Sequence, residues 1–169
     1  MDKITLAPIP VTLDCQQLME ANHIPADSDL AEEFTDLVAA AQSCLACKAI
    51  LVPVSAELPF PLPAGISPAY VYAMTVGREI EENEDCDYPY LGDVVRQAAL
   101  DQALAYTMDY LAGQNGGRRF SFTNPGTESG WETVNNVAIA QWLSCAEIGI
   151  TTDSRGNLTP WYSTLGLFY

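Results

Sequence analysis

Apolar residues in the N-terminal half recur with the period of a helix in one long segment. From Leu30 to Leu45 they return every three or four positions, which is the spacing of one helical face. Ser28 precedes this run as a favourable N-cap, and the acidic residues that follow it suit the positive end of a helix dipole. We therefore expect an amphipathic helix here, preceded by a shorter helix around Cys15 to Ala21.

Shorter apolar runs rich in β-branched and aromatic residues predict strands. Residues 49–54 and 69–76 are the clearest of these, and Pro53 places the first of them near an edge. Prolines also restrict the opening segment, residues 4–12, to an edge or a loop. Between the two clear strands, residues 58–63 alternate proline with apolar residues, which predicts an extended connector.

The second half of the chain predicts two further helices and a closing pair of short strands. Residues 91–112 carry apolar or small side chains on nearly every side, so we expect a central helix packed on more than one face. Ser129 and Glu132 have the spacing of a capping box, and Gly149 fits the end of the helix they would start. The mixture predicts one α+β domain over residues 1–169, with a mainly antiparallel sheet packed with helices.

The net charge of the chain argues against some classes of binding partner. The 169 residues include 22 acidic and seven basic ones, a formal net charge of −15. Such a chain repels phosphate backbones and anionic lipid surfaces, so we expect neither nucleic acid nor a membrane as a partner. No apolar run approaches the roughly 20 residues of a spanning helix, and the N-terminus lacks a signal-peptide pattern. The five cysteines, an odd number, fit a reducing compartment, and we expect a cytoplasmic protein.

Cys44 and Cys47 form the only C-x-x-C pair. Their spacing suits a redox dithiol or half of a metal site, but a structural zinc ion usually takes four ligands. His23 is the sole histidine, so the remaining ligands would have to come from scattered elements. We interpret the two cysteines as apolar residues on a helix, and a redox or metal role for them stays open.

Arg118 and Arg119 form the only local cluster of positive charge, directly after a Gly-rich loop. Two interpretations remain. The arginines pair with nearby surface carboxylates, which is common and weakly stabilising, or they hold an anionic ligand beside the backbone N–H groups of the turn.

Several short motifs follow one another from Ala73 onward. They are Thr75-Val76-Gly77 before the acidic Arg78-Glu79-Ile80-Glu81, Ala99-Leu100-Asp101-Gln102-Ala103, Arg119 with Pro125-Gly126, and Ile148-Gly149-Ile150-Thr151-Thr152 with Pro160 and Ser163. In these motifs the chain resembles the activation (reactivation) domain of vitamin B12-dependent methionine synthase, in its short stand-alone form. The resemblance is better over residues 69–169 than over the more divergent residues 1–68.

This resemblance implies binding of S-adenosylmethionine in support of corrinoid repair, with an α+β fold of the same kind. The inactive cob(II)alamin would be carried by a partner, a corrinoid-binding protein or methyltransferase, and reductively methylated there. Electrons would come from an external donor, because the chain has no recognisable flavin or iron–sulfur motif. Whether the protein is itself an enzyme stays open.

The resemblance also implies a set of ligand-binding residues. Arg119 would hold the methionyl carboxylate, which arginine can grip bidentately, and Pro125 and Gly126 would form the turn, where glycine permits close approach. Glu128 or Asp101 would contact the ribose or the amine.

Three departures from the family keep an alternative open. The chain has extra residues between Arg119 and Pro125, Thr127 follows Gly126 where the family has tyrosine, and Ala105 or a neighbour stands where the family has a ligand-binding glutamate. The alternative is a non-catalytic docking module that has kept the fold and lost the S-adenosylmethionine site. The acidic run from Glu79 to Asp87 would then face a basic partner surface, and the oligomeric state stays open.

Overall fold

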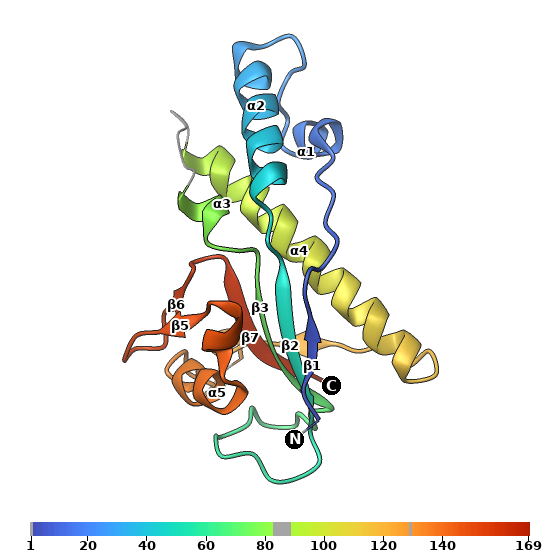
Figure 1. The fold of residues 1–169 in the computed structure, drawn as a ribbon, viewed down its shortest axis with the longest axis vertical. Coiled ribbons are helices and arrows are strands. Elements are labelled where there is room, and N and C mark those ends of the chain that lie inside the picture. The colour runs from blue at the N-terminus through green and yellow to red at the C-terminus, as the bar shows by residue number, and fades with distance from the viewer. Residues whose placement is uncertain (1, 83–88, 129) are drawn as a thin grey trace.

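An antiparallel sheet with helices on both faces organises the chain (Figure 1). The structure, a computed structural model, describes residues 2–82, 89–128 and 130–169. The helices are α1 (Cys15–Ala21), α2 (Asp29–Cys44), α3 (Glu79–Glu82), α4 (Pro89–Gln114) and α5 (Asn135–Leu143), with a 3₁₀ helix η1 (Cys145–Ile148). The strands are β1 (Ile4–Leu6), β2 (Lys48–Pro53), β3 (Tyr70–Thr75), β4 (Phe122–Thr123), β5 (Thr151–Thr152), β6 (Leu158–Thr159) and β7 (Ser163–Phe168). The predicted single-domain α+β fold is confirmed.

The strand order of the main sheet is β1-β2-β3-β7-β4, and every neighbouring pair is antiparallel. Strands β1 to β3 follow one another as a meander. Strand β7 lies on the other side of β3, with Tyr70 opposite Phe168 and Thr75 opposite Ser163. Strands β5 and β6 form a separate two-stranded sheet. Strand β3 therefore occupies the centre of the main sheet, although β7 comes from a distant part of the chain.

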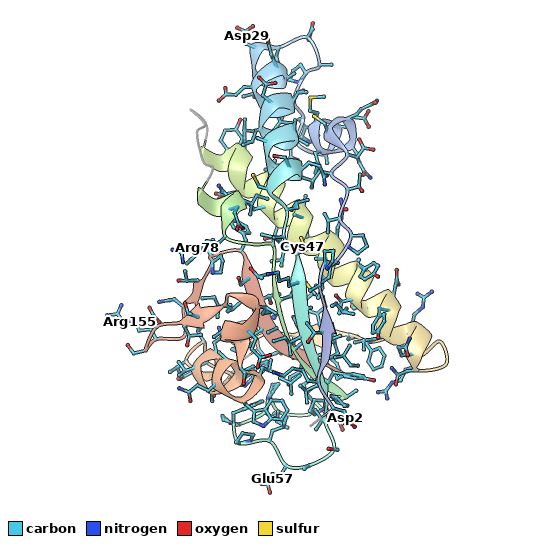
Figure 2. All side chains as sticks on the ribbon, viewed as in Figure 1. Asp2, Asp29, Cys47, Glu57, Arg78 and Arg155 are labelled. Atoms are coloured by element: carbon cyan, nitrogen blue, oxygen red, sulfur yellow. The ribbon has the colours of Figure 1, made fainter. Side chains whose placement is uncertain are left out.

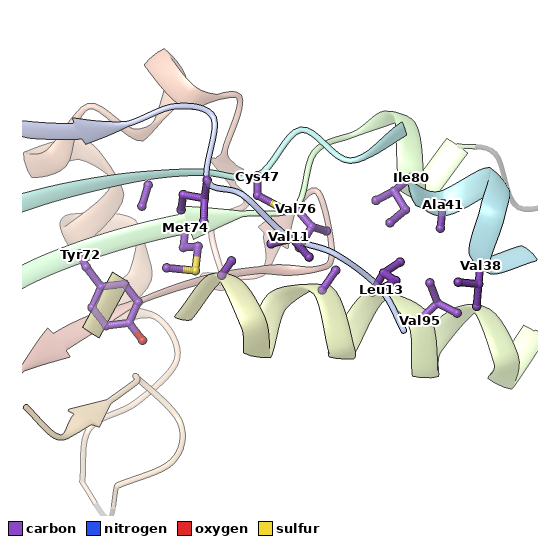
Figure 3. Close-up of a cluster of buried hydrophobic side chains, with 14 of the residues drawn as sticks. Val11, Leu13, Val38, Ala41, Cys47, Tyr72, Met74, Val76, Ile80 and Val95 are labelled. Atoms are coloured by element: carbon purple, nitrogen blue, oxygen red, sulfur yellow. The ribbon is translucent and has the colours of Figure 1, made fainter. Parts of the chain in front are cut away.

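The two faces of β3 belong to two different hydrophobic cores. Tyr72 and Met74 pack on the side of α4, together with residues such as Val95, as Figure 3 shows. Val71 and Ala73 lie in the other core, which includes α5. Because successive side chains of a strand point to opposite faces, a strand covered on both sides reads as a continuous apolar run. This arrangement explains the pattern at residues 69–76.

Helices α1 and α2 stand beyond one end of the strands, next to the first half of α4 (Figure 1). The predicted cap of α2 is confirmed: Ser28 Oγ accepts a hydrogen bond from the Ala31 N–H at 3.2 Å. Phe34 and Val38 from the apolar face of α2 are buried in the same core as Val95 of α4. The N-terminal helices are thereby attached to the sheet layer through α4.

One sequence prediction agrees with the pairing of β2 and another needs correction. Strand β2 is interior where it pairs with β1 at residues 49–51, and Pro53 lies beyond that pairing, as expected for a proline near an edge. Helix α5 begins at Asn135, after Val134 as an N-cap without a side-chain hydrogen bond, so the predicted capping box does not start it. Ser129 lies outside the described residues, and so does the part of the acidic run from Glu79 to Asp87 that follows Glu82. The docking role of that run stays a prediction.

Two contacts of Trp131 hold the segment before α5. The N–H of Gly126 donates to the Trp131 carbonyl oxygen at 2.7 Å. The indole Nε1 of Trp131 then donates to the Pro61 carbonyl oxygen at 2.9 Å. This contact with a segment 70 positions away holds the turn against the connector between β2 and β3.

In the described part of the chain, no helix combines the length and apolar character needed to cross a bilayer.

Candidate functional site

The chain reverses direction at the end of α4 and returns beside that helix. The N–H of Asn115 donates to the Leu111 carbonyl oxygen, and the N–H of Gly117 donates to the Ala112 carbonyl oxygen at 2.8 Å. Gly116 and Gly117 have φ values of +64° and +85°, a conformation that glycine adopts without steric cost. The Gly-rich loop thereby brings the following basic pair alongside the last turns of α4.

The two arginines have different surroundings. Arg118 places its guanidinium carbon 5.0 Å from the centroid of the Phe120 ring, a cation–π contact. Arg119 is exposed, and it makes no hydrogen bond or ion pair within the part of the chain that the structure describes. It lines a depression of about 450 Å³, which we call the arginine hollow and which is formed by Met108, Asp109, Ala112, Gly117, Arg119 and Phe120.

The arginine hollow matches the chemistry of a zwitterion. It carries one guanidinium and one carboxylate, those of Arg119 and Asp109, between apolar surfaces of Met108, Ala112 and Phe120. A guanidinium binds a carboxylate through charge-assisted hydrogen bonds, and a carboxylate binds an ammonium group in the same way. The volume lies within the range of roughly 300–1,000 Å³ that is typical of ligand pockets. An α-amino acid group fits these donors and acceptors.

The predicted Pro-Gly turn lies in another place, after β4. Pro125 is buried, whereas Gly126 has a φ of +93° and lines a second depression of about 300 Å³. This turn hollow is formed by Gly126, Glu128, Gly130, Trp131, Glu132 and Thr133. A carboxylate oxygen of Glu128 accepts a hydrogen bond from the Thr123 hydroxyl at 3.3 Å, which orients it toward the end of β4.

Asp101 lies in a third place, on the exposed side of α4. Its Oδ1 atom accepts a hydrogen bond from the Gln97 side-chain amide at 2.8 Å. It lines a depression of about 490 Å³, the α1–α4 groove, which is formed by Leu18, Asn22, Asp93, Val94, Gln97, Ala98, Asp101 and Tyr162. Of the predicted ligand residues, the structure brings Gly126 and Glu128 together and leaves Arg119 and Asp101 in two other depressions.

Sequence reasoning missed Asp109, the acidic residue that lines the arginine hollow together with Arg119. Ten positions separate the two residues, and no motif connects them. One available signal was the Gly-rich loop itself. Because such a loop permits a tight reversal, residues on its two sides become neighbours.

A buried polar network lies between the turn and the sheet. The Asn124 side-chain nitrogen donates to the hydroxyl oxygens of Tyr72 and Thr164 and to the Leu165 carbonyl oxygen. Burial raises the pKa of Tyr72 to about 12, against the smaller lowering effect of its hydrogen bonds with Thr164 and Asn124. The phenol is thus neutral at physiological pH and takes part in this network through its hydrogen bonds.

The cysteines of the described chain show no metal-binding arrangement. Cys44 ends α2, whereas Cys47 follows the helix, so the prediction that both lie on a helix was wrong for Cys47. Burial raises the pKa of the Cys47 thiol to about 11 and that of Cys145 to about 12, which disfavours the thiolate. Figure 2 shows Cys47 in the interior, with Glu57 and Arg155 at the periphery. Among described residues, no three His, Cys, Asp or Glu side chains gather around a possible metal position.

The fold and its depressions define an α+β domain whose candidate ligand site is an open hollow lined by one basic and one acidic side chain. Comparison with models of known protein families gives no match, and comparison with curated protein sequences gives none either. The relation to the methionine synthase activation domain therefore rests on the sequence motifs as a resemblance.

Proposed function

We propose that this protein binds S-adenosylmethionine in the arginine hollow and so supports reductive methylation of an inactive cob(II)alamin on a partner corrinoid protein. The observation that carries the proposal is the position of Arg119. Its guanidinium has no partner among the described residues, and it shares a hollow with the carboxylate of Asp109. The nature of the reaction comes from the resemblance in the motifs.

Both charged residues of the hollow have a role in this proposal. Arg119 holds the methionyl carboxylate, and Asp109 holds the α-ammonium group. The apolar side of the hollow, with Phe120, receives the remainder of the ligand. The methyl group comes from S-adenosylmethionine, the electron from an external donor, and the cobalt that is methylated belongs to the partner. The contribution of this chain is to bind and orient the methyl donor.

Calorimetric titration with S-adenosylmethionine tests the proposal, with S-adenosylhomocysteine as a comparison ligand. Loss of a charge-assisted pair of this kind costs about 1.5–3 kcal/mol, so Arg119→Ala is expected to weaken binding by roughly tenfold to a hundredfold. Asp109→Asn should weaken it less. Arg155→Ala, which removes an exposed arginine from the turn between β5 and β6, is the charge-matched control.

The position of the site is tested by the same titration. If Asp101→Asn or Glu128→Gln weakens binding while Arg119→Ala does not, the ligand lies in another depression and the assignment to the arginine hollow is wrong. Absence of heat at about millimolar ligand removes the S-adenosylmethionine function altogether, because a dissociation constant above about 1 mM corresponds to a binding free energy weaker than about 4 kcal/mol. Circular dichroism of each variant verifies that the fold is intact.

A docking module without S-adenosylmethionine is the second candidate, and one observation favours it. The predicted ligand residues are divided among three depressions. In addition, the Thr127 hydroxyl donates to the Asn124 carbonyl oxygen at 2.6 Å and so closes the turn, in the position where the resembled family has tyrosine. A docking role for so acidic a chain predicts binding to a basic partner that weakens with salt. Salt-insensitive binding would count against it.

A further inference from the structure

We infer that the α1–α4 groove receives an amphipathic helix of a partner protein, with two basic side chains that pair with Asp93 and Asp101. These aspartates and Gln97 lie four positions apart along α4, on one side of the helix. At 1.5 Å per residue, the two carboxylates are about 12 Å apart along the axis, which is roughly two helical turns. A helix with basic residues two turns apart therefore matches this spacing.

The floor of the groove is apolar. Leu18 of α1 and Val94 and Ala98 of α4 line it, and each is half-buried. None of the described residues that line the groove is basic. An apolar strip between two acidic positions is the complement of a helix face that carries leucines between basic residues.

The two aspartates differ in how strongly they can attract a basic side chain. Asp93 accepts a hydrogen bond from the Tyr162 hydroxyl at 2.9 Å and lies 3.5 Å from Nη1 of the buried Arg96, although 62% of its side chain remains exposed. Asp101 is exposed and has no cationic partner in the described part of the chain. Arg96 weakens the attraction at one end of the groove, so Asp101 contributes most of the charge recognition.

The surroundings of the groove favour a protein partner over a small polyamine. Two exposed aromatic residues are close in sequence to residues of the groove: Trp161, 67% exposed, precedes Tyr162, and Tyr90, 54% exposed, is three positions before Asp93. A polyamine would neutralise the carboxylates and leave the apolar floor in water. An amphipathic helix covers this floor, and aromatic residues are enriched in protein interfaces. The net charge of −15 also accelerates encounter with a basic segment.

The test uses a synthetic amphipathic helical peptide with two lysines two turns apart and leucines between them. Binding to the full chain is followed by NMR through the side-chain amide signals of Asn22 and Gln97, which both line the groove. Saturable shifts of these signals are expected. A second peptide, in which glutamines replace both lysines, should bind at least about tenfold more weakly, because both charge pairs are lost.

Variants of the chain locate the interaction. Asp101→Asn should weaken binding about fivefold, the effect of one partly exposed charge pair. Ala98→Lys fills the floor and adds a like charge, so it should weaken binding by about tenfold or more. Asp36→Asn removes an exposed carboxylate of α2 that lies outside the groove, and it should change the affinity less than about twofold.

Several results would overturn the inference. These are absence of peptide binding, equal affinity for the wild type and Asp101→Asn, or shifts confined to residues outside the groove. Spermine that produces the same amide shifts and displaces the peptide at equal concentration would identify a polyamine site instead. The titration contains no S-adenosylmethionine, and its variants lie outside the arginine hollow, so this inference and the proposed function can fail separately.

Discussion

The side-chain nitrogen of Asn124 lies 2.7 Å from the phenolic oxygen of Tyr72 and 2.6 Å from the Leu165 carbonyl oxygen. Asn124→Ala removes the donor to both and leaves the fully buried phenol with only the Thr164 hydroxyl, at 3.5 Å. An unsatisfied buried polar group costs about 1–3 kcal/mol, and we expect the free energy of unfolding to fall by about 2 kcal/mol. Urea denaturation measures the change.

Tyr72→Phe is the matched comparison for this network. It removes the phenolic oxygen and leaves Asn124 bonded to Thr164 and Leu165, so a smaller loss of about 1 kcal/mol is expected. In the double variant the total loss of stability should be smaller than the sum of the two single losses. The hydrogen bond that the two residues share can be lost only once. An Asn124→Ala protein as stable as the wild type would show that the network contributes nothing.

Gly156 permits a close approach between the β5–β6 turn and the chain before α5. A Cβ atom at this position would overlap the Thr133 carbonyl oxygen and lie 2.9 Å from Cα of Val134, and the glycine has a φ of +85°. Gly156→Ala combines overpacking with an unfavourable φ, and we expect a loss of about 3 kcal/mol or more in the free energy of unfolding. Thermal and urea denaturation provide the measurement.

Gly65→Ala separates the two causes. Gly65 has a similar φ of +77°, but a Cβ atom there meets no other atom within 4 Å. In Gly65→Ala, only the cost of the positive φ, about 1 kcal/mol in the free energy of unfolding, should remain. Equal losses in the two variants would mean that the approach to Thr133 is not tight.

The cysteines of the described chain should differ in the rate at which their thiols react. Cys47 and Cys145 are each 1% exposed, with pKa values raised by burial to about 11 and about 12, and the thiolate is the reactive form. Alkylation of the folded protein near pH 7, followed by mass mapping, should modify both far more slowly than the half-buried Cys15. In urea the rates should converge. Rapid alkylation of Cys47 in the folded state would contradict its position in the core.

Alkaline pH should destabilise the fold. In the folded state the pKa of Cys47 rises from 9.0 to about 11 and that of Tyr72 from 10.0 to about 12, both because of burial. The unfolded chain therefore releases these protons first, so stability is full below pH 9 and declines as pH rises toward 12. Each group contributes up to about 1.4 kcal/mol per pH unit.

Urea denaturation at a series of alkaline pH values measures this decline. Tyr72→Phe should reduce the fall in the free energy of unfolding between pH 10 and pH 12. This interval lies between the unfolded and folded pKa values of the phenol. If the curves of the variant and the wild type run parallel over this interval, Tyr72 does not titrate differently in the two states.

The elements that the sequence predicted well are those fixed by local rules. Helix α2 combines a serine cap with a regular apolar face, and β3 is a short apolar run that is rich in aromatic and β-branched residues. The start of α5 was mispredicted from a local capping pattern, and the segment before that helix makes a distant contact between Trp131 and Pro61. A local capping pattern cannot report such a contact.

The candidate site was only partly predictable for a similar reason. Arg119 stood out because basic residues are rare in this chain. Asp109 became its neighbour only through the reversal of the chain after α4, and Asp101, eight positions earlier on the same helix, was separated from it by about 12 Å along the axis. Residue type identified the arginine, whereas the tertiary path decided which carboxylate shares its hollow.

The position of β7, beside the central strand β3, has a consequence for the order of events during protein synthesis. Ser163 and Thr75 form a hydrogen bond across 88 positions of chain, so the meander of β1, β2 and β3 leaves the ribosome long before β7 does. During that interval one edge of β3 has no neighbour, and an apolar strand with an open edge is a template for aggregation. The nascent chain is therefore most vulnerable between the emergence of β3 and that of β7, when a chaperone has the most to protect.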